Sequence, residues 1–308
     1  IEVKGHPLFW HITIPDWLPG DYEQIKQYWI RRLQEIAKRY DGVIKTFDVI
    51  NEVTSVPVFD YEPSQKDRHY RSHMPINGKF ADFAFYETAH HFRKSRLVLN
   101  ETASPWDGNI FKKEVSHYYL LAENLMNKGY KIDILGLQYH NFNTPENIYD
   151  LNQYFYNPKH LYKVMDCYGG LGKPLSISEI TIPCYDDDIQ AETVRNLYRI
   201  WFSHKDMESI IYWNLGDHCA AVGDGWAEDQ FKSGLVRSDF SEKPSYQALD
   251  ELINREWQTN LEVDSGKDHV YFKAFYGNYE VSVVRDGKKV TRDLHLSKNG
   301  YDEFFFTV

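Results

Sequence analysis

Polar side chains with catalytic chemistry stand at the ends of several short apolar runs in this sequence. The run-end groups are Asn51-Glu52, Asn100-Glu101, Gln138-Tyr139-His140, Ser178-Glu179 and Trp213 to Asp217, and His6, Trp10 and His11 cluster near the start of the chain. In a barrel of alternating strands and helices the carboxyl ends of the strands converge on one face, and that face holds the active site. We therefore expect these side chains to meet at a single site.

Two of these residues, Glu52 and Glu179, are carboxylates that come from separate runs. For either glutamate alone, a capping or ion-paired carboxylate is the simpler interpretation. Together they form the pair that glycoside hydrolysis requires, in which one carboxyl protonates the leaving oxygen and the other attacks the sugar or activates a water. The pair therefore favours glycoside hydrolysis over a purely structural role for both.

The runs that carry these residues have the composition of strands buried on both faces of a parallel sheet. The runs cover residues 43–50, 96–99, 132–139, 174–180 and 210–215, and the leading segment 3–11 is interpreted as one more strand that leads into a loop. Stretches with a helical spacing of apolar residues separate them, at about residues 21–40, 81–93, 111–128, 158–168, 189–203 and 244–257. This alternation predicts an α/β fold with six βα units.

The character of the sequence changes after about residue 257. Residues 260–308 lack a helical period and alternate between apolar and polar side chains at 269–275, 279–284 and 302–308, with turn signals at 276–278 and at Asp286-Gly287. This pattern is typical of a small antiparallel β module. We therefore expect a catalytic part at 1–257 and a C-terminal β module at 258–308, which either binds glycan or caps the barrel.

The composition excludes several other classes of protein. The chain has 308 residues and a net charge of −10, which disfavours binding to phosphate backbones and anionic membranes. No apolar run approaches the roughly 20 residues that a membrane span needs. Three widely separated cysteines argue against a zinc knuckle or a disulfide scaffold. The 8 Trp, 23 Tyr and 18 Phe suit either a thick α/β core or a surface that contacts sugars.

Six motifs at the run ends occur in an order and spacing that resemble the family 10 glycoside hydrolases, the xylanase family, whose fold is a (β/α)8 TIM barrel. The resemblance covers about residues 3–255, and the motifs are similar to those of the third to eighth barrel strands. They are Gly5-His6-Pro7-Leu8-Phe9-Trp10-His11 with Pro15-Asp16-Trp17-Leu18, Phe47-Asp48-Val49-Ile50-Asn51-Glu52, Leu99-Asn100-Glu101, Gly136-Leu137-Gln138-Tyr139-His140, Ile177-Ser178-Glu179-Ile180 and Tyr212-Trp213-Asn214-Leu215-Gly216-Asp217. Residues 234–246, which end in Lys243-Pro244-Ser245-Tyr246, resemble the closing helix.

The resemblance implies a role for each of these residues. Glu52 would be the general acid and then the base, and Glu179 would be the nucleophile of a retaining reaction. His140 would orient Glu179, and Asn51 would bind the sugar 2-hydroxyl. The remaining implied substrate-binding residues are His6, Trp10, His11, Gln138, Trp213 and Trp226. For each histidine the alternative is a buried imidazole of the core, and for each tryptophan it is packing at the barrel end.

The sequence also departs from the family pattern. The first two βα units of the eight-stranded barrel are absent, so the fold expected here is a barrel that lacks them, whose open sheet edges would not be stable alone. We expect the missing strands to come from the same precursor. Thr181 stands where the family usually has Asp, and Glu101 stands where it often has Asp. Ala221 stands where a tryptophan is usual, although Trp226 is near. The loop at 54–79 is long.

The resemblance predicts a retaining endo-β-1,4-xylanase that acts on xylan or another plant β-glycan. It implies no metal or organic cofactor. Such an enzyme is expected to be secreted, with a signal peptide that is not present in this chain. Two alternatives remain open at this point. One is a related β-glycanase or β-xylosidase, and the other is a non-catalytic carbohydrate-binding barrel, which would need neither glutamate.

Overall fold

A computed structural model gives the fold of the chain. It describes residues 2–11, 15, 17–19, 21–55, 79–102, 106, 116–143, 155–220, 222–223, 226–264, 266, 269–297, 300 and 303–307. The chain divides into two compact units, Ile1–Gln247 and Ala248–Val308.

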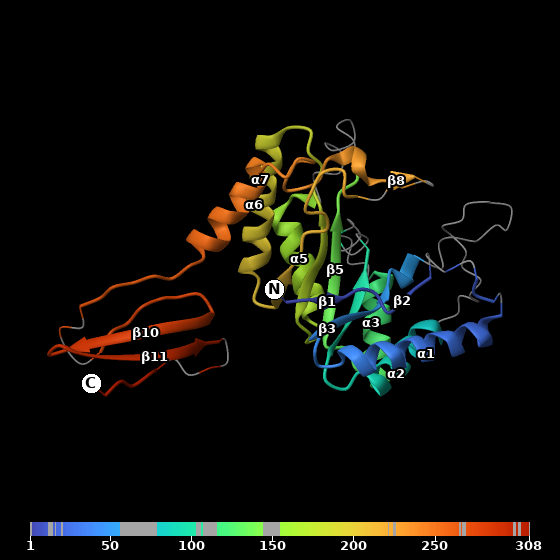
Figure 1. The fold of residues 1–308 in the computed structure, drawn as a ribbon, viewed down its shortest axis with the longest axis horizontal. Coiled ribbons are helices and arrows are strands. Elements are labelled where there is room, and N and C mark those ends of the chain that lie inside the picture. The colour runs from blue at the N-terminus through green and yellow to red at the C-terminus, as the bar shows by residue number, and fades with distance from the viewer. Residues whose placement is uncertain are drawn as a thin grey trace. The chain divides into compact units, whose positions relative to one another are not determined.

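The first unit is built around one parallel sheet (Figure 1). Its strands are β1 (Lys4–Gly5), β2 (Phe9–Trp10), β3 (Thr46–Asn51), β4 (Arg96–Glu101), β5 (Ile134–His140), β6 (Leu175–Thr181) and β7 (Met207–Ile210). They follow the order β1-β3-β4-β5-β6-β7, with β2 also paired to β3, and each of these pairings is parallel. The sheet is thus an open part of a βα barrel, which confirms the predicted fold class.

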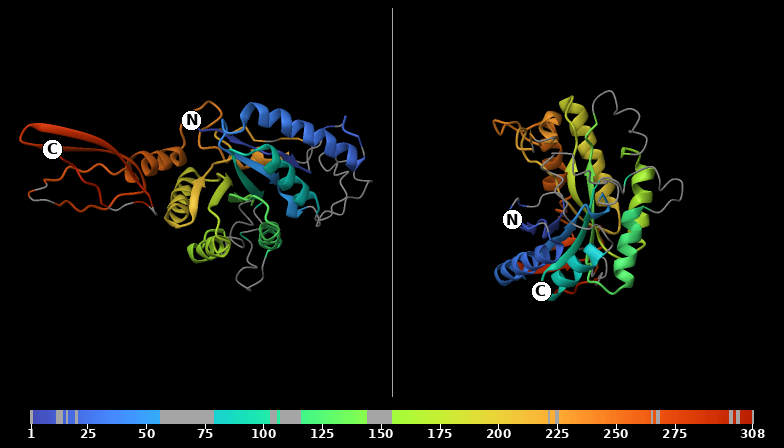
Figure 2. Two further views of the ribbon diagram at one scale, coloured as in Figure 1. Left: turned by 90° about the horizontal axis from the view of Figure 1, so that it is seen from below. Right: turned by 90° about the vertical axis from the view of Figure 1, so that its right-hand side faces the viewer.

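Helices follow the strands and pack along the outside of the sheet. They are α1 (Tyr22–Tyr40), α2 (Lys79–His91), α3 (His117–Asn127), α5 (Pro158–Gly169) and α6 (Asp187–Ser203). The first unit also contains the short helical turns η1 (Val53–Ser55) and η5 (Glu228–Phe231), α7 (Pro244–Glu251) spans the boundary between the units, and η6 (Leu252–Glu256) belongs to the second unit. The left view of Figure 2 shows α1, α2, α3, α5 and α6 as an arc around the strands. The apolar stripe of each helix therefore faces the sheet, as a buried parallel sheet requires.

Local sequence signals explain where the helices begin. Asp21 caps α1 by accepting a hydrogen bond from the backbone nitrogen of Gln24 at 2.9 Å, and Asn157 and Asp186 cap α5 and α6 in the same way. Pro158 occupies the first turn of α5, where a missing N–H costs nothing. The three caps fix the direction in which each helix leaves the loop before it.

Two predicted strands differ from those observed. The leading segment 3–11 forms two short strands, β1 and β2, because Pro7 lies between them and has no N–H for a continuous ladder. The strand expected at 210–215 begins earlier, at Met207, and ends at Ile210. Ile211 and Trp213 still donate to β6 carbonyls, but the chain then leaves the sheet and bridges Gly216 to Val236.

The second unit contains an antiparallel hairpin of β10 (Gly277–Arg285) and β11 (Lys288–Leu296). Asp286 and Gly287 both have positive φ, 50° and 76°, as the predicted two-residue turn requires. The turn expected at 276–278 is instead the start of β10. The expected strands at 269–275 and, within the described residues, at 303–307 do not form. Tyr271 is 91% exposed and Phe305 77%, so these segments lack a surface to pack on.

Two further features complete the description. A short antiparallel ribbon joins β8 (Val222–Gly223) and β9 (Trp226–Ala227). Among the described residues, no helix combines the length and apolarity that crossing a bilayer demands. The long loop expected at 54–79 lies almost entirely outside the described residues, as does Ala221.

Candidate active site

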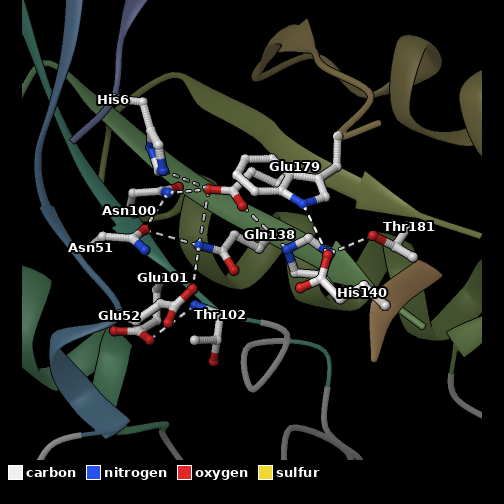
Figure 3. Close-up of polar contacts among 12 residues, drawn as sticks. His6, Asn51, Glu52, Asn100, Glu101, Thr102, Gln138, His140, Glu179 and Thr181 are labelled. Atoms are coloured by element: carbon white, nitrogen blue, oxygen red, sulfur yellow. Dashed lines mark hydrogen bonds and ion pairs between the residues drawn. The ribbon is translucent and has the colours of Figure 1, made fainter. Parts of the chain in front are cut away.

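The candidate site lies at the carboxyl ends of β3 to β6, where the predicted residues converge (Figure 3). Asn51 ends β3, and Gln138 and Glu179 lie near the ends of β5 and β6. The strands are in register here, with Asn51 opposite Asn100 and Gln138 opposite Glu179. A shift in register just before Gln138 turns its side chain toward Glu179, a common use of strand irregularities beside active sites.

The amide of Gln138 joins the two glutamates. Its nitrogen Nε2 lies 3.2 Å from Oε1 of Glu52 and 3.1 Å from Oε1 of Glu179, and it also donates to Oδ1 of Asn51 at 3.0 Å. Because both oxygens lie within 3.2 Å of the same nitrogen, the distance between Oε1 of Glu52 and Oε1 of Glu179 cannot exceed the sum of these two hydrogen-bond lengths. This limit accommodates the roughly 5–5.5 Å separation of the two carboxyl groups in retaining glycosidases.

Glu179 is surrounded by nitrogen atoms. Asn100 donates to its Oε1 at 2.9 Å in addition to Gln138, and Nε2 of His140 lies 3.2 Å from its Oε2. Nε2 of His6 lies 3.8 Å from Oε1. Glu179 is only 4% exposed, so these contacts fix the direction in which its carboxylate points.

Glu52 lies just beyond the end of β3 and has an unusual backbone conformation. Its φ is 54°, in the left-handed region that side-chain-bearing residues rarely adopt, and its N–H donates to the carbonyl of Asn100 at 3.1 Å. Burial raises the pKa of Glu52, and the nearby charge of Glu179 raises it further, against the lowering effect of hydrogen bonds from Gln138 and Asn51. Glu52 is therefore suited to hold a proton and to donate it.

His140 connects Glu179 to Thr181. Its Nδ1 lies 2.8 Å from Oγ1 of Thr181, on the side of the ring opposite Glu179, and the ring stacks on Phe142 with centroids 5.1 Å apart. The family that the sequence resembles usually has an aspartate at this position. Here the hydroxyl of Thr181 contacts the histidine instead. The contact with Thr181 therefore fixes the orientation of the ring and the position of the nitrogen that faces Glu179.

His6 is part of a second charged group at the edge of the site. Its Nδ1 lies 2.8 Å from Asp48, which also forms an ion pair with Lys4 at 2.8 Å. Burial lowers the pKa of His6, but the hydrogen bond to Asp48 and the charges of Glu179 and Asp48 outweigh it, so the pKa is raised overall. The two carboxylates that His6 faces, Asp48 and Glu179, therefore favour its protonated form.

Trp213 covers one side of the site. Its indole is 40% exposed and meets the edges of His6 and His140, with ring centroids 5.8 and 6.0 Å apart. Its Nε1 donates to Glu228 at 3.3 Å. Burial raises the pKa of Glu228, and the charge of Glu179 adds to it. A fixed, partly exposed indole is a suitable face for a sugar ring.

The other predicted binding residues are less closely tied to the glutamates. Trp10 lies on β2 opposite Asn51, and its buried Nε1 makes no hydrogen bond to any described residue. His11 is buried, and this lowers its pKa to about 4, so the ring is neutral at neutral pH. The backbone of Trp226 forms part of β9, but its side chain lies outside the described part of the structure.

Sequence reasoning gave no role to three residues that the structure brings to the site: Asn100, Phe142 and Glu228. Asn100 carried an available signal, because it ends its strand as Asn51 does. Phe142 lies in the loop after β5, and Glu228 begins η5 directly after β9, where the sequence does not reveal which way a side chain points. Within the described residues, no cluster of His, Cys, Asp and Glu could hold a metal ion.

The fold and the site together define a βα-barrel protein with a pair of linked carboxylates at its strand ends. The model of the family described as glycosyl hydrolase family 10 matches residues 1–252. This chain therefore belongs to glycosyl hydrolase family 10.

Individual relatives are distant. The endo-1,4-beta-xylanase C of Paenibacillus barcinonensis is 25% identical over 286 residues, which cover 81% of this chain and 24% of that protein. The anti-sigma-I factor RsgI6 of Acetivibrio thermocellus is 23% identical over 309 residues, 97% of this chain and 35% of that protein. This chain thus spans about a quarter to a third of the length of these relatives.

A solved structure supports the fold. The family 10 structure from Paenibacillus barcinonensis superposes with a TM-score of 0.62 at 22% identity, and it covers 84% of this chain and 79% of that chain. Identity at this level establishes the shared fold and leaves the activity to be argued from the site.

Proposed function

We propose that this protein is a retaining endo-β-1,4-xylanase that hydrolyses xylan. The observation that carries the proposal is the hydrogen bonding of Glu52 and Glu179 to one amide nitrogen of Gln138. The shared nitrogen keeps the nearest oxygens of the two carboxyl groups close together, which supports the short separation that a double displacement needs.

The two steps follow from the surroundings of each glutamate. The Glu179 carboxylate attacks the anomeric carbon while Glu52 gives its proton to the departing glycosidic oxygen, so that a glycosyl ester forms on Glu179. Glu52, now ionised, takes a proton from a water that attacks the same carbon and releases Glu179. Each displacement inverts the anomeric centre, so the product retains the original configuration.

The environments of the two groups support this division of labour. The raised pKa of Glu52 suits the residue that must deliver a proton. Glu179 is instead held by Asn100, Gln138 and His140, which fix the oxygen that would attack. Trp213 offers a flat, partly exposed surface beside it.

The choice of xylan rests on the family and on relatives such as the Paenibacillus barcinonensis endo-1,4-beta-xylanase. A related β-glycanase or β-xylosidase is the nearest alternative. A regulatory or carbohydrate-binding protein is the alternative of a different class, since one relative is named an anti-sigma-I factor. The presence of both glutamates favours catalysis, because binding alone requires neither.

Reducing-sugar release from xylan, cellulose and mixed-linkage glucan separates these alternatives. We expect hydrolysis of xylan in preference to the two glucans, and loss of that hydrolysis in Glu179→Ala. Equal or faster hydrolysis of a glucan would assign a different glycanase. Xylan binding without any hydrolysis by the unaltered protein would favour the non-catalytic alternative.

A further inference from the structure

Glu101 is a further carboxyl group near the site, with no part in the steps above. It is the last residue of β4, beside the strand that ends before Glu52, and its side chain is fully buried (Figure 3). A buried carboxyl needs partners, because burial without them is costly. The identity of those partners indicates what Glu101 does.

Both oxygens of Glu101 accept backbone hydrogen bonds. Oε1 accepts from the nitrogen of Thr102 at 2.9 Å, and Oε2 accepts from the nitrogen of Thr54 at 3.0 Å. Thr54 belongs to η1, the helical turn that starts directly after Glu52. One carboxyl group thus attaches the turn that follows β3 to the end of β4.

Glu52 lies between two such attachments. Its own N–H donates to the carbonyl of Asn100, and two residues later the N–H of Thr54 donates to Glu101. Between them, Glu52 keeps a φ of 54°, a strained conformation that persists only when its surroundings enforce it. The bond from Thr54 to Glu101 is the attachment on the far side of the strained residue.

The charges around Glu101 agree with this proximity. The pKa of Glu101 is raised to about 7, because burial and, to a smaller extent, the charge of Glu52 outweigh the lowering effect of the bonds from Thr102 and Thr54. Among the described residues, the buried phenol of Tyr118 on α3 also interacts with Glu101, which helps to raise the pKa of that phenol. Glu52 and Glu101 are therefore close enough to affect each other's charge.

We propose that Glu101 is a positioning residue for the general acid: by holding the N–H of Thr54 it fixes the turn that aims Glu52 at the departing oxygen. The inference rests on the proposed glycosidase function, in which Glu52 is the proton donor. Glu101 itself has both oxygens bound to backbone nitrogens and does not need to touch the sugar.

The variant Glu101→Gln tests the role, because an amide nitrogen cannot accept one of the two N–H bonds. A series of aryl xylobiosides with leaving groups of increasing pKa separates proton donation from the rest of the reaction. We expect kcat/KM to fall by about tenfold or more for the poorest leaving groups and for xylo-oligosaccharides. For dinitrophenyl xylobioside, whose leaving group departs without a proton, it should stay within about threefold.

A double-variant experiment tests whether Glu101 acts through Glu52. In a Glu52→Ala background the proton donor is already absent, so adding Glu101→Gln should cause no further loss of kcat/KM on aryl xylobiosides with poor leaving groups, the substrates on which Glu101→Gln alone costs about tenfold or more. Glu208→Gln is the matched control, since Glu208 lies in an exposed ion pair with Arg96. This variant should show the same dependence of kcat/KM on the leaving-group pKa as the unaltered protein. If Glu101→Gln does not fold, Thr54→Pro takes its place, because proline in the first turn of η1 removes the N–H that Glu101 accepts and leaves the carboxyl group unchanged.

Two results would overturn the inference while leaving the proposed function intact. One is an equal loss of kcat/KM on good and poor leaving groups by an active enzyme. The other is the same fold loss from Glu101→Gln with and without Glu52. Inactivity of the unaltered protein on every xylobioside would overturn the proposed function and this inference together.

Discussion

Glu52 and Glu179 carry the same side chain in two different environments. Glu52 follows the end of a strand in a strained conformation, and burial and a neighbouring charge raise its pKa. Glu179 lies within its strand and is surrounded by amide and imidazole nitrogens. The difference between the residues therefore comes from their position at the strand ends and not from their chemistry.

The raised pKa of Glu52 predicts the alkaline side of the pH profile. The general acid acts in its protonated form, so kcat/KM on xylan should fall as the pH rises through the Glu52 pKa, and this limb should lie above the ordinary glutamate value of about 4.3. The measurement is kcat/KM on xylo-oligosaccharides from pH 4 to 10. With dinitrophenyl xylobioside and Glu52→Ala the same limb should disappear, and its persistence would assign the proton to another group.

At the residue scale, the sequence allowed prediction of the strand-end residues but not of all their partners. Gln138, His140 and Glu179 were expected at one face because each ends an apolar run, and the structure brings them together. Glu228 could not be predicted, since its contact with Trp213 depends on how the chain folds back after β7. Glu101 was expected at the same face because it ends an apolar run, but its bond with the N–H of Thr54 could not be predicted.

At the scale of elements, the pairing of β4 with β5 places Asn100 against a glycine. Asn100 lies opposite Gly136, and a Cβ built on Gly136 would come within 2.5 Å of Oδ1 of Asn100 and 3.3 Å of its Cα. Asn100 occupies the space that a side chain at position 136 would fill, and from there it donates to Glu179. The orientation of the nucleophile therefore depends on the neighbouring strand.

This arrangement predicts the effect of Gly136→Ala. The added methyl group must displace Asn100 or separate the strands, so the free energy of unfolding should fall by roughly 1–3 kcal/mol. Because Asn100 then loses its place beside Glu179, kcat/KM on xylo-oligosaccharides should fall by about 100-fold. Chemical denaturation and steady-state kinetics measure the two effects.

Gly129→Ala is the control for stability loss alone. Gly129 has a φ of 82° and open space around its Cβ position, so alanine there should cost about 1 kcal/mol of stability through its backbone. Its kcat/KM should not change. Full activity in Gly136→Ala would show that Asn100 does not position Glu179.

The elements themselves were largely predictable, and the exceptions have physical causes. Apolar runs and helical spacing indicated the strands and helices of the first unit, with ends that differ by a few residues. Pro7 divides the first strand, and the bridge from Gly216 to Val236 draws the chain away after β7. In the second unit, residues 269–275 and 303–307 alternate between apolar and polar side chains but form no strand, because they lack a surface to pack on.

At the scale of the whole molecule, the candidate site lies within the first unit. All the site residues discussed above precede Gln247, and the hairpin of β10 and β11 forms a separate sheet. The described sheet of the first unit is open, since β1 and β2 pair only with β3 and β7 only with β6. The partial barrel therefore supplies the candidate catalytic residues without the hairpin.

A chain that ends at residue 257 tests this separation. We expect its kcat/KM on soluble xylo-oligosaccharides to stay within about twofold of the full chain, because it keeps every residue of the site. Binding of both chains to insoluble xylan, measured by depletion from solution, then reports any contribution of residues 258–308. A large loss of activity on soluble substrate, with circular dichroism unchanged, would mean that the second unit takes part in catalysis.

The most direct test of the account is the configuration of the azide product formed by Glu52→Ala. With dinitrophenyl xylobioside, this variant should form the glycosyl ester on Glu179 and then hydrolyse it slowly, because no base activates water. Azide needs no base, so it should restore turnover and yield the β-glycosyl azide, with the configuration of the substrate retained. Formation of the α-glycosyl azide by this variant would contradict a covalent intermediate on Glu179.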